Sequence, residues 1–355
     1  MRQDEPQLHL PLGVGVALLA AVLFGVSTPF AKFLLSHSPP VLLAALLYLG
    51  SGLGLSLLYL AQGKQKEDRI SKSDAPWLCG AVLFGGIAAP VLLMAGLGHT
   101  PASTASLLLN LEAVFTSLLA WFVFHENFDR RIAAGMVLIV GGGVVLGWSS
   151  SGPFAVPPGS LAIAGACLCW GLDNNLTQRV SASNPYQVAA IKGVVAGAVN
   201  FAVAHFMGAH LPSPSLIAGA MAVGFVGYGL SLTLFVLALR QVGTARTGAY
   251  FSVAPFVGAA VSAVFLHEPV GIRFLTAAAL MGLGVWLHLT ETHSHRHTHT
   301  PLTHAHEHTH DAHHQHAHQP GMDTTEPHTH EHTHTALTHE HPHFPDIHHR
   351  HTHAD

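Results

Sequence analysis

The sequence predicts an all-α membrane protein with ten transmembrane helices in two inverted five-helix repeats, followed by a disordered histidine-rich tail. The first observation behind this prediction is composition: 49% of the 355 residues are apolar and only 10% are Asp, Glu, Lys or Arg. An average soluble domain carries about 25% charged residues, so the deficit indicates that lipid is the solvent. The second observation is a series of long apolar segments, and the third is an internal repeat.

Charge and histidine content divide the chain into an apolar body and a polar tail. Residues 1–290 contain 13 basic and 10 acidic side chains, a net charge of +3. Residues 291–355 contain two basic and nine acidic side chains, a net charge of −7, and 23 of the 31 histidines. We therefore expect a short N-terminus, a first repeat, a loop, a second repeat and a tail, at 1–9, 10–148, 149–158, 159–290 and 291–355.

Ten apolar segments are long enough to cross a bilayer, which requires about 20 mostly apolar residues. Clusters of Pro, Gly, Asn and Ser separate them, as is typical of turns. Many connections are short, and short connections force neighbouring helices to run antiparallel in a tight bundle. We expect the helices near 10–35, 40–61, 76–98, 102–124, 131–148, 159–180, 185–206, 215–239, 244–266 and 271–290.

The connections between these segments alternate in basic charge. The second connection, 62–75, contains four Lys or Arg, and the following even-numbered connections, near 130, 179 and 240–246, contain further Arg. The odd-numbered connections contain none before Arg273. Because cytoplasmic loops carry the excess of Lys and Arg, we expect a multi-pass protein of the plasma membrane with both termini, and hence the tail, in the cytoplasm.

Two pairs of motifs repeat in the same order along the chain. The Phe-Gly at 24–25 and the Trp-Gly at 170–171 are 146 residues apart, and the His-Glu motifs at 125–126 and 267–268 are 142 apart. Each half then contains five helices, and an odd number makes the second half enter the membrane from the opposite side. Inverted repeats are a transporter architecture with a site near the midplane. A chance likeness between helices of simple composition is the alternative.

Several of these motifs together resemble a known family. The segment FGVSTPFAK at 24–32, AVFT at 113–116, the His-Glu endings at 125–126 and 267–268, and the three glycines at 141–143 resemble the EamA domain of the drug/metabolite transporter superfamily. The resemblance covers about residues 10–290, hence two such domains. It implies ten helices, inverted halves, and export or exchange of small metabolites by alternating access.

Glu112 is the favoured functional residue, because ionisable side chains inside membrane helices are costly and mark functional sites. Ser106 and Thr116 should share its helix face, which makes a polar stripe, whereas Asn110 should point to a different face. Lys192 is a plausible partner for the carboxylate. Glu112 would contact the solute or take up a proton, and the alternative is a structural Glu–Lys pair that fixes packing.

Six further positions are candidates for the solute and coupling site, namely Asp173, Asn174, Asn175, Lys32, Asn110 and Trp170. Asp173, Asn174 and Asn175 supply a carboxylate and two amides in one turn, which could bind a polar solute, accept a proton or form interhelical hydrogen bonds. Lys32 matches the Lys that the resembled family has near the end of its first helix; snorkelling to the interface is the alternative. Trp170 could line a cavity or simply pack.

The sequence contains no constellation that indicates an enzyme. It has no Gly-x-Ser-x-Gly, no His-Glu-x-x-His and no phosphate-binding loop. We therefore expect a protein that is not an enzyme, with no required cofactor and no nucleic-acid partner, and transport driven by a gradient of ion or solute. The expected partners are a small-molecule solute, the lipid bilayer and a possible second copy in a homodimer.

The tail alternates His with Thr, Ala and Glu, and contains almost nothing apolar to bury, so we expect it to be disordered. Imidazole suits Zn, Ni, Co and Cu, and no spacing defines a closed site, so we expect labile binding of such ions. An inert low-complexity segment or a pH sensor are the alternatives. The candidate metal ligands are His293, His295, His297, His299, His304, His306, His308, His310, His328, His330, His332 and His334.

These observations leave three functional hypotheses. The first is a secondary transporter that exports a small organic solute or metabolite. The second keeps the transporter but makes the solute a transition metal or metal–metabolite complex, with the tail as collector or sensor. The third is a membrane-tethered metal buffer, for which ten helices are more than anchoring requires. The second is weakened because no predicted membrane segment carries a cluster of His, Asp and Glu.

Overall fold

The computed structural model describes most of the chain in two compact units, Met1–Glu291 and Thr292–Asp355, which we treat separately. The described residues are 12–61, 70, 74–123, 130–147, 157–180, 184–242, 247, 250–289, 294–299, 302–308, 328–334 and 337–342.

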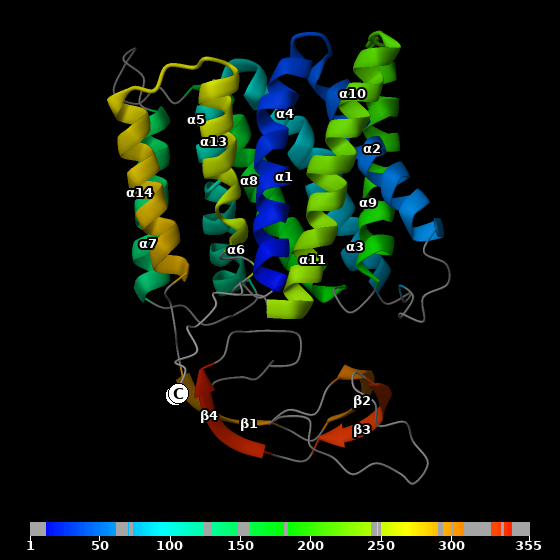
Figure 1. Cartoon of the computed structure of the whole chain (residues 1–355), viewed down its shortest axis with the longest axis vertical. Coiled ribbons are helices and arrows are strands. Elements are labelled where there is room, and N and C mark those ends of the chain that lie inside the picture. Colours follow the sequence, from blue (N-terminus) through cyan, green and yellow to red (C-terminus); the bar gives the residue numbers. More distant parts are fainter. Residues whose placement is uncertain are drawn as a thin grey trace, which may run out of the picture. The chain divides into compact units, whose positions relative to one another are not determined.

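The first unit is helical throughout its described elements, and Figure 1 shows the helices packed as one bundle. In three places, consecutive helices follow one another directly and form one longer helical run. These runs are α3 with η2 and α4, α5 with α6, and α10 with η3 and α11. The elements are α1 (Leu12–Leu35), α2 (Pro40–Ala61), α3 (Ala75–Ala81), η2 (Val82–Ala88), α4 (Ala89–His99), α5 (Ala102–Leu108), α6 (Leu111–Phe122), α7 (Arg130–Gly147), α8 (Pro158–Arg179), α9 (Pro185–Phe206), α10 (Pro214–Gly224), η3 (Phe225–Leu230), α11 (Ser231–Val242), α13 (Ala254–Phe265) and α14 (Ile272–Leu289).

Seven helical runs of the described chain are long and apolar enough to cross a membrane. The prediction of a multi-pass α-helical membrane protein is therefore confirmed. α13 and α14 are apolar but shorter, and α8 is 22 residues long with less apolar composition, so the count of ten spans stays a prediction. The seven runs are Gly13–Leu35, Pro40–Ala61, Ala75–His99, Ala102–Phe122, Arg130–Gly147, Tyr186–Phe206 and Pro214–Ala238.

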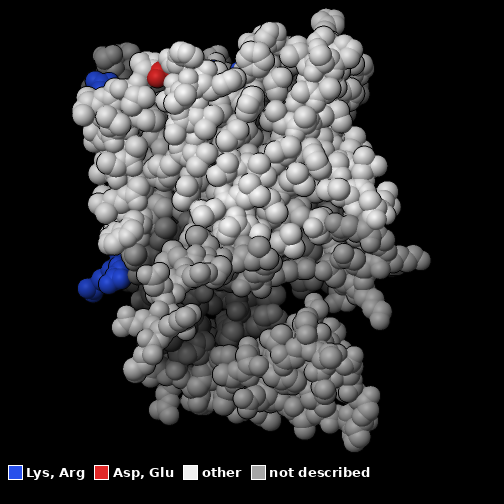
Figure 2. Space-filling view, viewed as in Figure 1, with Lys and Arg blue, Asp and Glu red and all other residues white. Residues whose placement is uncertain are grey.

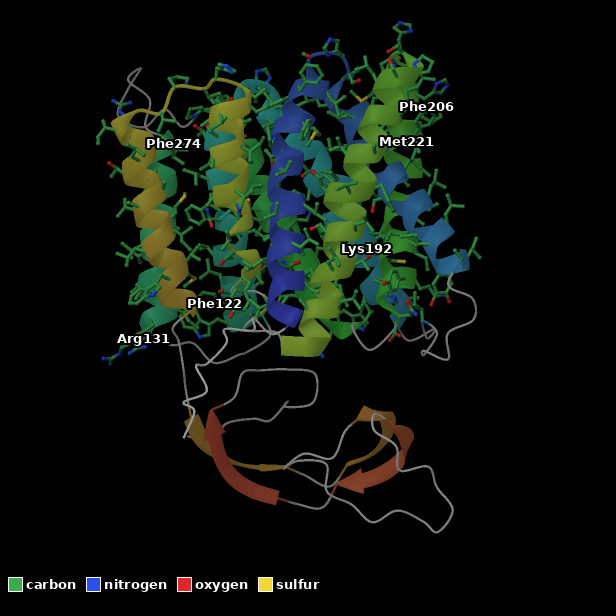
Figure 3. The ribbon with its side chains drawn as sticks, viewed as in Figure 1. Phe122, Arg131, Lys192, Phe206, Met221 and Phe274 are labelled. Atoms are coloured by element: carbon green, nitrogen blue, oxygen red, sulfur yellow. The ribbon has the colours of Figure 1, made fainter. Side chains whose placement is uncertain are left out.

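The outer surface of the bundle is apolar. Leu57 and Phe206, for example, are 69% and 88% exposed, which a soluble protein would avoid over so large a contiguous area. Figure 2 shows one face without Lys, Arg, Asp or Glu through its middle, and the charged atoms in view lie towards the two ends. In Figure 3, Arg131 lies at one end of the helices, whereas Lys192 lies between the ends. Lipid is the solvent that this surface fits.

The principal helix contacts join the first half of the chain to the second. α2 packs on α9 and α7 on α14; α1 packs on α11 and α13, and α8 packs on α4 and α6. These contacts are symmetric between the two halves. α1 corresponds to α8, and its partners α11 and α13 correspond to α4 and α6, the partners of α8. The α2–α9 and α7–α14 pairs each join two corresponding helices. α2 and α9 approach closely because Gly52 and Gly193 face each other without side chains.

Two of the segments predicted as plain helices contain a π-helical stretch. In the first, η2, the cause is Pro90, which has no N–H to donate and whose ring clashes with a carbonyl one turn earlier. The second stretch, η3, is rich in glycine, and Gly224 and Gly227 lie against the backbone of α2 and the side chain of Ser27. Such π-bulges free backbone carbonyls and are frequent at functional sites.

The segments predicted at 102–124 and 244–266 are also interrupted. Residues 109–110 form a turn in which Asn110 N–H bonds the carbonyl of Leu107 at 3.1 Å, three residues back, and the Asn110 amide donates to the same carbonyl at 2.9 Å. Residues 252–253 form a turn just before Pro255. A polar side chain that competes for the backbone and a proline are the respective causes.

The second unit holds the histidine-rich tail, and the expectation of a disordered tail stays a prediction, because most of the residues from 291 to 355 lie outside the described ones. Its described residues form two separate two-stranded antiparallel ladders, β1 with β4 and β2 with β3. Alternating His and Thr needs no buried core to satisfy the backbone, because strand pairing itself bonds the N–H and C=O groups. The strands are β1 (Ser294–His299), β2 (Leu302–His308), β3 (His328–His334) and β4 (Leu337–Pro342).

Candidate functional site

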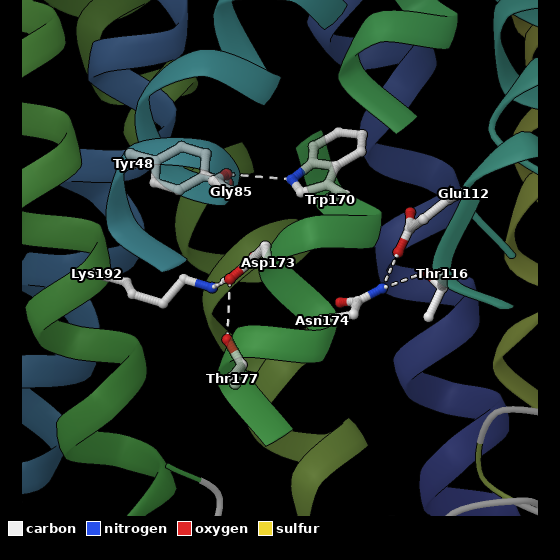
Figure 4. A network of polar contacts seen from close by, with 9 residues as sticks. All are labelled: Tyr48, Gly85, Glu112, Thr116, Trp170, Asp173, Asn174, Thr177 and Lys192. Atoms are coloured by element: carbon white, nitrogen blue, oxygen red, sulfur yellow. Dashed lines mark hydrogen bonds and ion pairs between the residues drawn. The ribbon is translucent and has the colours of Figure 1, made fainter. Parts of the chain in front are cut away.

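A buried ion pair joins α8 to α9 inside the bundle. The Lys192 ammonium donates to both carboxylate oxygens of Asp173 at 2.6 Å, and the Thr177 hydroxyl donates to one of them at 2.9 Å (Figure 4). Asp173 is 6% and Lys192 8% exposed. The prediction that Lys192 pairs with Glu112 was therefore wrong, because α9 turns Lys192 towards the neighbouring helix α8 of its own half.

Glu112 instead bonds the amide of Asn174. The Asn174 Nδ2 donates to Glu112 Oε1 at 2.8 Å and to the Thr116 hydroxyl at 3.3 Å (Figure 4). Glu112 is half-buried and Asn174 is exposed, so this part of the network is accessible from outside the bundle. Successive helix residues point about 100° apart, so α8 presents Asp173 to α9 and Asn174 to α6.

Of the predicted polar stripe on the fourth segment, only part is formed. Thr116 joins Glu112 through Asn174. Ser106 does not, because it is fully buried on α5 against Gly258 of α13. Ser106 and Glu112 are six residues apart, which at about 100° per residue places them about 120° apart even in an unbroken helix, and the turn at 109–110 lies between them.

Asn175 and Asn110 have structural contacts. Asn175 is buried and donates to the carbonyls of Gly171 at 2.8 Å and Thr116 at 3.3 Å, which fastens α8 to α6. Asn110 is buried and donates to Leu107 and, at 3.9 Å, to the sulfur of Met281 on α14. These contacts favour the interhelical hydrogen-bonding alternative for Asn175 and give Asn110 a structural role as well.

The carbonyl of Gly85 accepts hydrogen bonds from two aromatic side chains beside the ion pair. It accepts from the Trp170 Nε1 at 3.2 Å and from the Tyr48 hydroxyl at 2.7 Å (Figure 4). An i→i+5 bond to this carbonyl would come from Pro90, which has no N–H, so the carbonyl is free for side chains. A Cβ on Gly85 would overlap the carboxylate of Asp173. Gly85 is thus a contact residue for both the aromatic side chains and the ion pair.

Sequence reasoning missed Tyr48, Gly85 and Thr177, and also Asn200, whose amide donates to the Gly86 carbonyl at 3.3 Å. One signal could have found the two carbonyls. Gly85 and Gly86 precede Pro90 by five and four residues inside an apolar helix, which is where a proline releases backbone acceptors.

Aromatic rings lie beside this network. Phe24 of α1 contacts the rings of Trp170, Tyr228 and Phe251 with centroids 6.4, 5.8 and 5.6 Å apart, and Tyr228 contacts Tyr48 at 5.7 Å. Contacts at these separations are attractive beyond the area they bury. The Trp170 ring therefore has both a packing contact and a hydrogen bond to the network.

Lys32 lies away from the network, at the end of α4. Its ammonium donates to the carbonyls of Leu97 at 2.5 Å and Thr100 at 3.0 Å, which suits a cation at a helix C-terminus. Glu268, the acidic residue of the second His-Glu motif, accepts from the N–H groups of Ala102 and Ser103 at 2.7 and 2.8 Å. Lys32 and Glu268 together hold the turn between α4 and α5 from both sides.

The metal-ligand predictions fall in the tail. Among the described residues no group of three or more His, Cys, Asp or Glu is placed to hold a metal. His293 and His310 lie outside the described residues. The other ten candidates lie at backbone positions of three strands: His295, His297 and His299 in β1, His304, His306 and His308 in β2, and His328, His330, His332 and His334 in β3.

Comparison with known proteins shows that the sequence matches a family of transporters. A family model described as the EamA-like transporter family matches the chain twice, at residues 11–148 and 157–290. A solved crystal structure, described only as that of a protein, has a TM-score of 0.59 at 20% identity, over 78% of this chain and 98% of its own. That likeness shows the fold alone.

Curated relatives are similar over nearly the same part of the chain. An uncharacterized transporter of Methanothermobacter thermautotrophicus is 28% identical over 76% of this chain and 84% of its own length. A probable amino-acid metabolite efflux pump of Salmonella typhimurium is 26% identical over 77% of this chain and 93% of its own length.

Proposed function

Because this chain belongs to the EamA-like transporter family, we propose that it is a secondary transporter that exports a small polar solute by alternating access. The observation that carries the proposal is the polar network of Figure 4. Ionisable side chains inside an apolar bundle are costly and mark solute or ion pathways. Its hydrogen bonds join Gly85 and Glu112 of the first matched region to Trp170 and Asn174 of the second, beside the Asp173–Lys192 pair of the second region.

The arrangement of the helices supports two inverted halves. The π-helical stretches η2 and η3 begin 143 residues apart along the chain, and the turns at 109–110 and 252–253 are separated by the same number of residues. The same irregularities therefore recur at matching positions of the two halves. The contacts of α1 correspond to those of α8. Each half would then move as a unit about the network, as in transporters built from inverted repeats. The alternation of basic loops supports cytoplasmic termini.

The open part of the network suits a solute with an ammonium and a carboxylate group. Glu112 offers a carboxylate that an ammonium can pair with, and the Asn174 amide and Thr116 hydroxyl offer donors for a carboxylate. Such a solute would take the place of the 2.8 Å bond between Glu112 and Asn174 and leave the Asp173–Lys192 pair intact. The Salmonella relative, named for amino-acid metabolite efflux, supports this class and the outward direction.

The direct test is counterflow. The full chain is reconstituted in liposomes loaded with unlabelled amino acids, and uptake of each labelled amino acid is measured. We expect saturable uptake of at least one amino acid, and background uptake by Glu112→Gln with an unchanged thermal unfolding profile.

A matched control is Asp74→Asn, which removes a carboxylate at the start of α3, outside the network, and should transport like the parent. Wild-type rates from Glu112→Gln would remove Glu112 from the mechanism. An absence of counterflow for every amino acid would overturn the proposed solute class.

A further inference from the structure

The second His-Glu motif of the sequence, at 267–268, forms a contact that the proposed transport site does not use. α13 ends at Phe265, and His267 has a φ of 54°, in the left-handed region that few residues other than glycine adopt. The Glu268 N–H donates to the carbonyl of Ala263 at 3.1 Å, which is the long bond of a Schellman helix ending. This ending reverses the chain and brings the Glu268 side chain to α5.

Glu268 connects the two halves at one end of the bundle. Its two carboxylate oxygens accept from the N–H groups of Ala102 and Ser103, the first two residues of α5, at 2.7 and 2.8 Å. The first N–H groups of a helix have no partner within that helix, and the helix dipole favours a negative charge beside them. Glu268 belongs to the second matched region and α5 to the first, so the contact lies between the halves.

The helices at this end are closely packed. α5 and α13 lie side by side (Figure 1). Six residues of α5 are buried, whereas Val114 is the one buried residue among those that the structure describes in α6. A Cβ on Gly258 of α13 would lie 2.8 Å from the Gly25 carbonyl of α1 and 2.8 Å from the Ser106 hydroxyl of α5. The fourth segment is therefore enclosed along α5 and more exposed along α6.

The charge of the loops favours an outer position for the enclosed end. The turn between α4 and α5 is an odd-numbered connection without Lys or Arg, whereas 62–75 contains four such residues. In an exporter, a solute that leaves Glu112 for the outside has to pass the enclosed end. That end must then open once in each transport cycle, and α5 must separate from the end of α13.

We propose that Glu268 is a latch, which holds the outer end closed in the state that the structure shows and releases α5 when that end opens. This inference rests on the alternating access proposed above. Release breaks two charge-assisted hydrogen bonds, which are stronger than neutral ones. The carboxylate thus shifts the population of the resting transporter towards the closed outer end. The first His-Glu motif, at 125–126, lies outside the described residues, and the latch is assigned to one end alone.

The test measures how readily the enclosed end becomes accessible. Ser106→Cys is the reporter, because Ser106 is fully buried between α5 and Gly258. It is placed in the full chain with the three native cysteines replaced by Ala. Right-side-out and inverted vesicles are treated with a membrane-impermeant maleimide, and the rate of labelling is measured with and without Glu268→Gln. This substitution keeps the size of the side chain and removes its charge.

A second variant acts on the other partner of the same contact. Ala102→Pro removes the N–H that donates to Glu268 and keeps the carboxylate, and proline is accepted at the first position of a helix. The matched control is Asp74→Asn, which removes a carboxylate at the start of α3. Thermal unfolding profiles of all variants show whether they keep the stability of the parent.

We expect Glu268→Gln and Ala102→Pro to raise the labelling rate in right-side-out vesicles about tenfold, the factor that one hydrogen bond to a charged group contributes. Asp74→Asn should label like the parent. An unchanged rate in a latch variant that unfolds like the parent would overturn the latch, and so would a rise in inverted vesicles instead. Counterflow of amino acids by the parent is measured in parallel: its absence would remove the proposed solute class, whereas unchanged labelling beside normal counterflow would refute the latch alone.

Discussion

The two carboxylates of the network have opposite surroundings. Asp173 is 6% exposed and is bonded through both oxygens to the ammonium of Lys192. Glu112 is half-buried, and its described partner is the neutral amide of an exposed residue, Asn174. One carboxylate is thus paired with a cation and enclosed, while the other bonds a neutral amide and is only partly buried.

This difference assigns separate roles to the two sides of α8. A buried ion pair loses several kcal/mol when one partner is removed, so it serves best as a fixed support. A carboxylate bonded to an amide can exchange that partner for a solute at much smaller cost. We therefore expect the Asp173–Lys192 pair to maintain the structure, and Glu112 with Asn174 to contact the solute.

The largest effect should follow from Lys192→Met. The substitution leaves the Asp173 carboxylate buried without a cation, which costs about 3–5 kcal/mol, so unfolding free energy and transport should both fall. The double variant Asp173→Asn with Lys192→Met removes both charges and should recover much of the stability. Chemical unfolding in detergent measures both. If single and double variants are equally unstable, the pair is not the support we describe.

Gly85→Ala should be next in size. The added methyl group would overlap the Asp173 carboxylate and displace it, and displacement of a site by about 1 Å can lower rates by up to about 100-fold. Alanine favours a helix over glycine by about 1 kcal/mol, so the loss cannot come from helix propensity. Gly141→Ala on α7, with open space around it, is the control. Equal counterflow rates in the two variants would contradict the close contact.

Asn174→Ala should weaken solute binding with a smaller effect. The amide is one donor in the open part of the network, and a hydrogen bond to a charged group contributes about 1.5–3 kcal/mol. We expect the solute concentration at half-maximal flux to rise about tenfold, with little change in maximal flux. The concentration dependence of counterflow measures this. A reduced maximal rate at unchanged half-saturation would place Asn174 in a conformational step instead.

The smallest effect should come from Tyr48→Phe. The Gly85 carbonyl loses the 2.7 Å bond but keeps the one from Trp170. Interhelical hydrogen bonds in membrane proteins average about 0.6 kcal/mol, so unfolding free energy should fall by about that amount. Tyr59→Phe, near the end of α2, is the matched control. A loss above about 2 kcal/mol would mean that the two donors do not share the carbonyl as described.

The helix positions were largely predictable because length, apolar composition and turn residues are local signals. α2 and α9 begin and end at the residues predicted, 40–61 and 185–206. The interruptions at η2 and at 109–110 were not predicted, since they depend on which carbonyls a proline or an asparagine competes for.

The site was predictable in its residue types but not in its pairs. Glu112, Asp173, Asn174 and Lys192 do lie in one network. Their partners depend on how far each helix is rotated about its axis, which a linear pattern does not encode. Because of that rotation, Lys192 contacts Asp173, and Asn174 donates a hydrogen bond to Glu112.

Alternating access around the open part of the network is the central claim, and the accessibility of one side chain tests it most directly. An Asn174→Cys variant, with Cys79, Cys167 and Cys169 replaced by Ala, is labelled with a membrane-impermeant maleimide in right-side-out and in inverted vesicles. The account predicts labelling from both sides, slowed by a transported amino acid. Labelling from one side only, with and without amino acids, would contradict it.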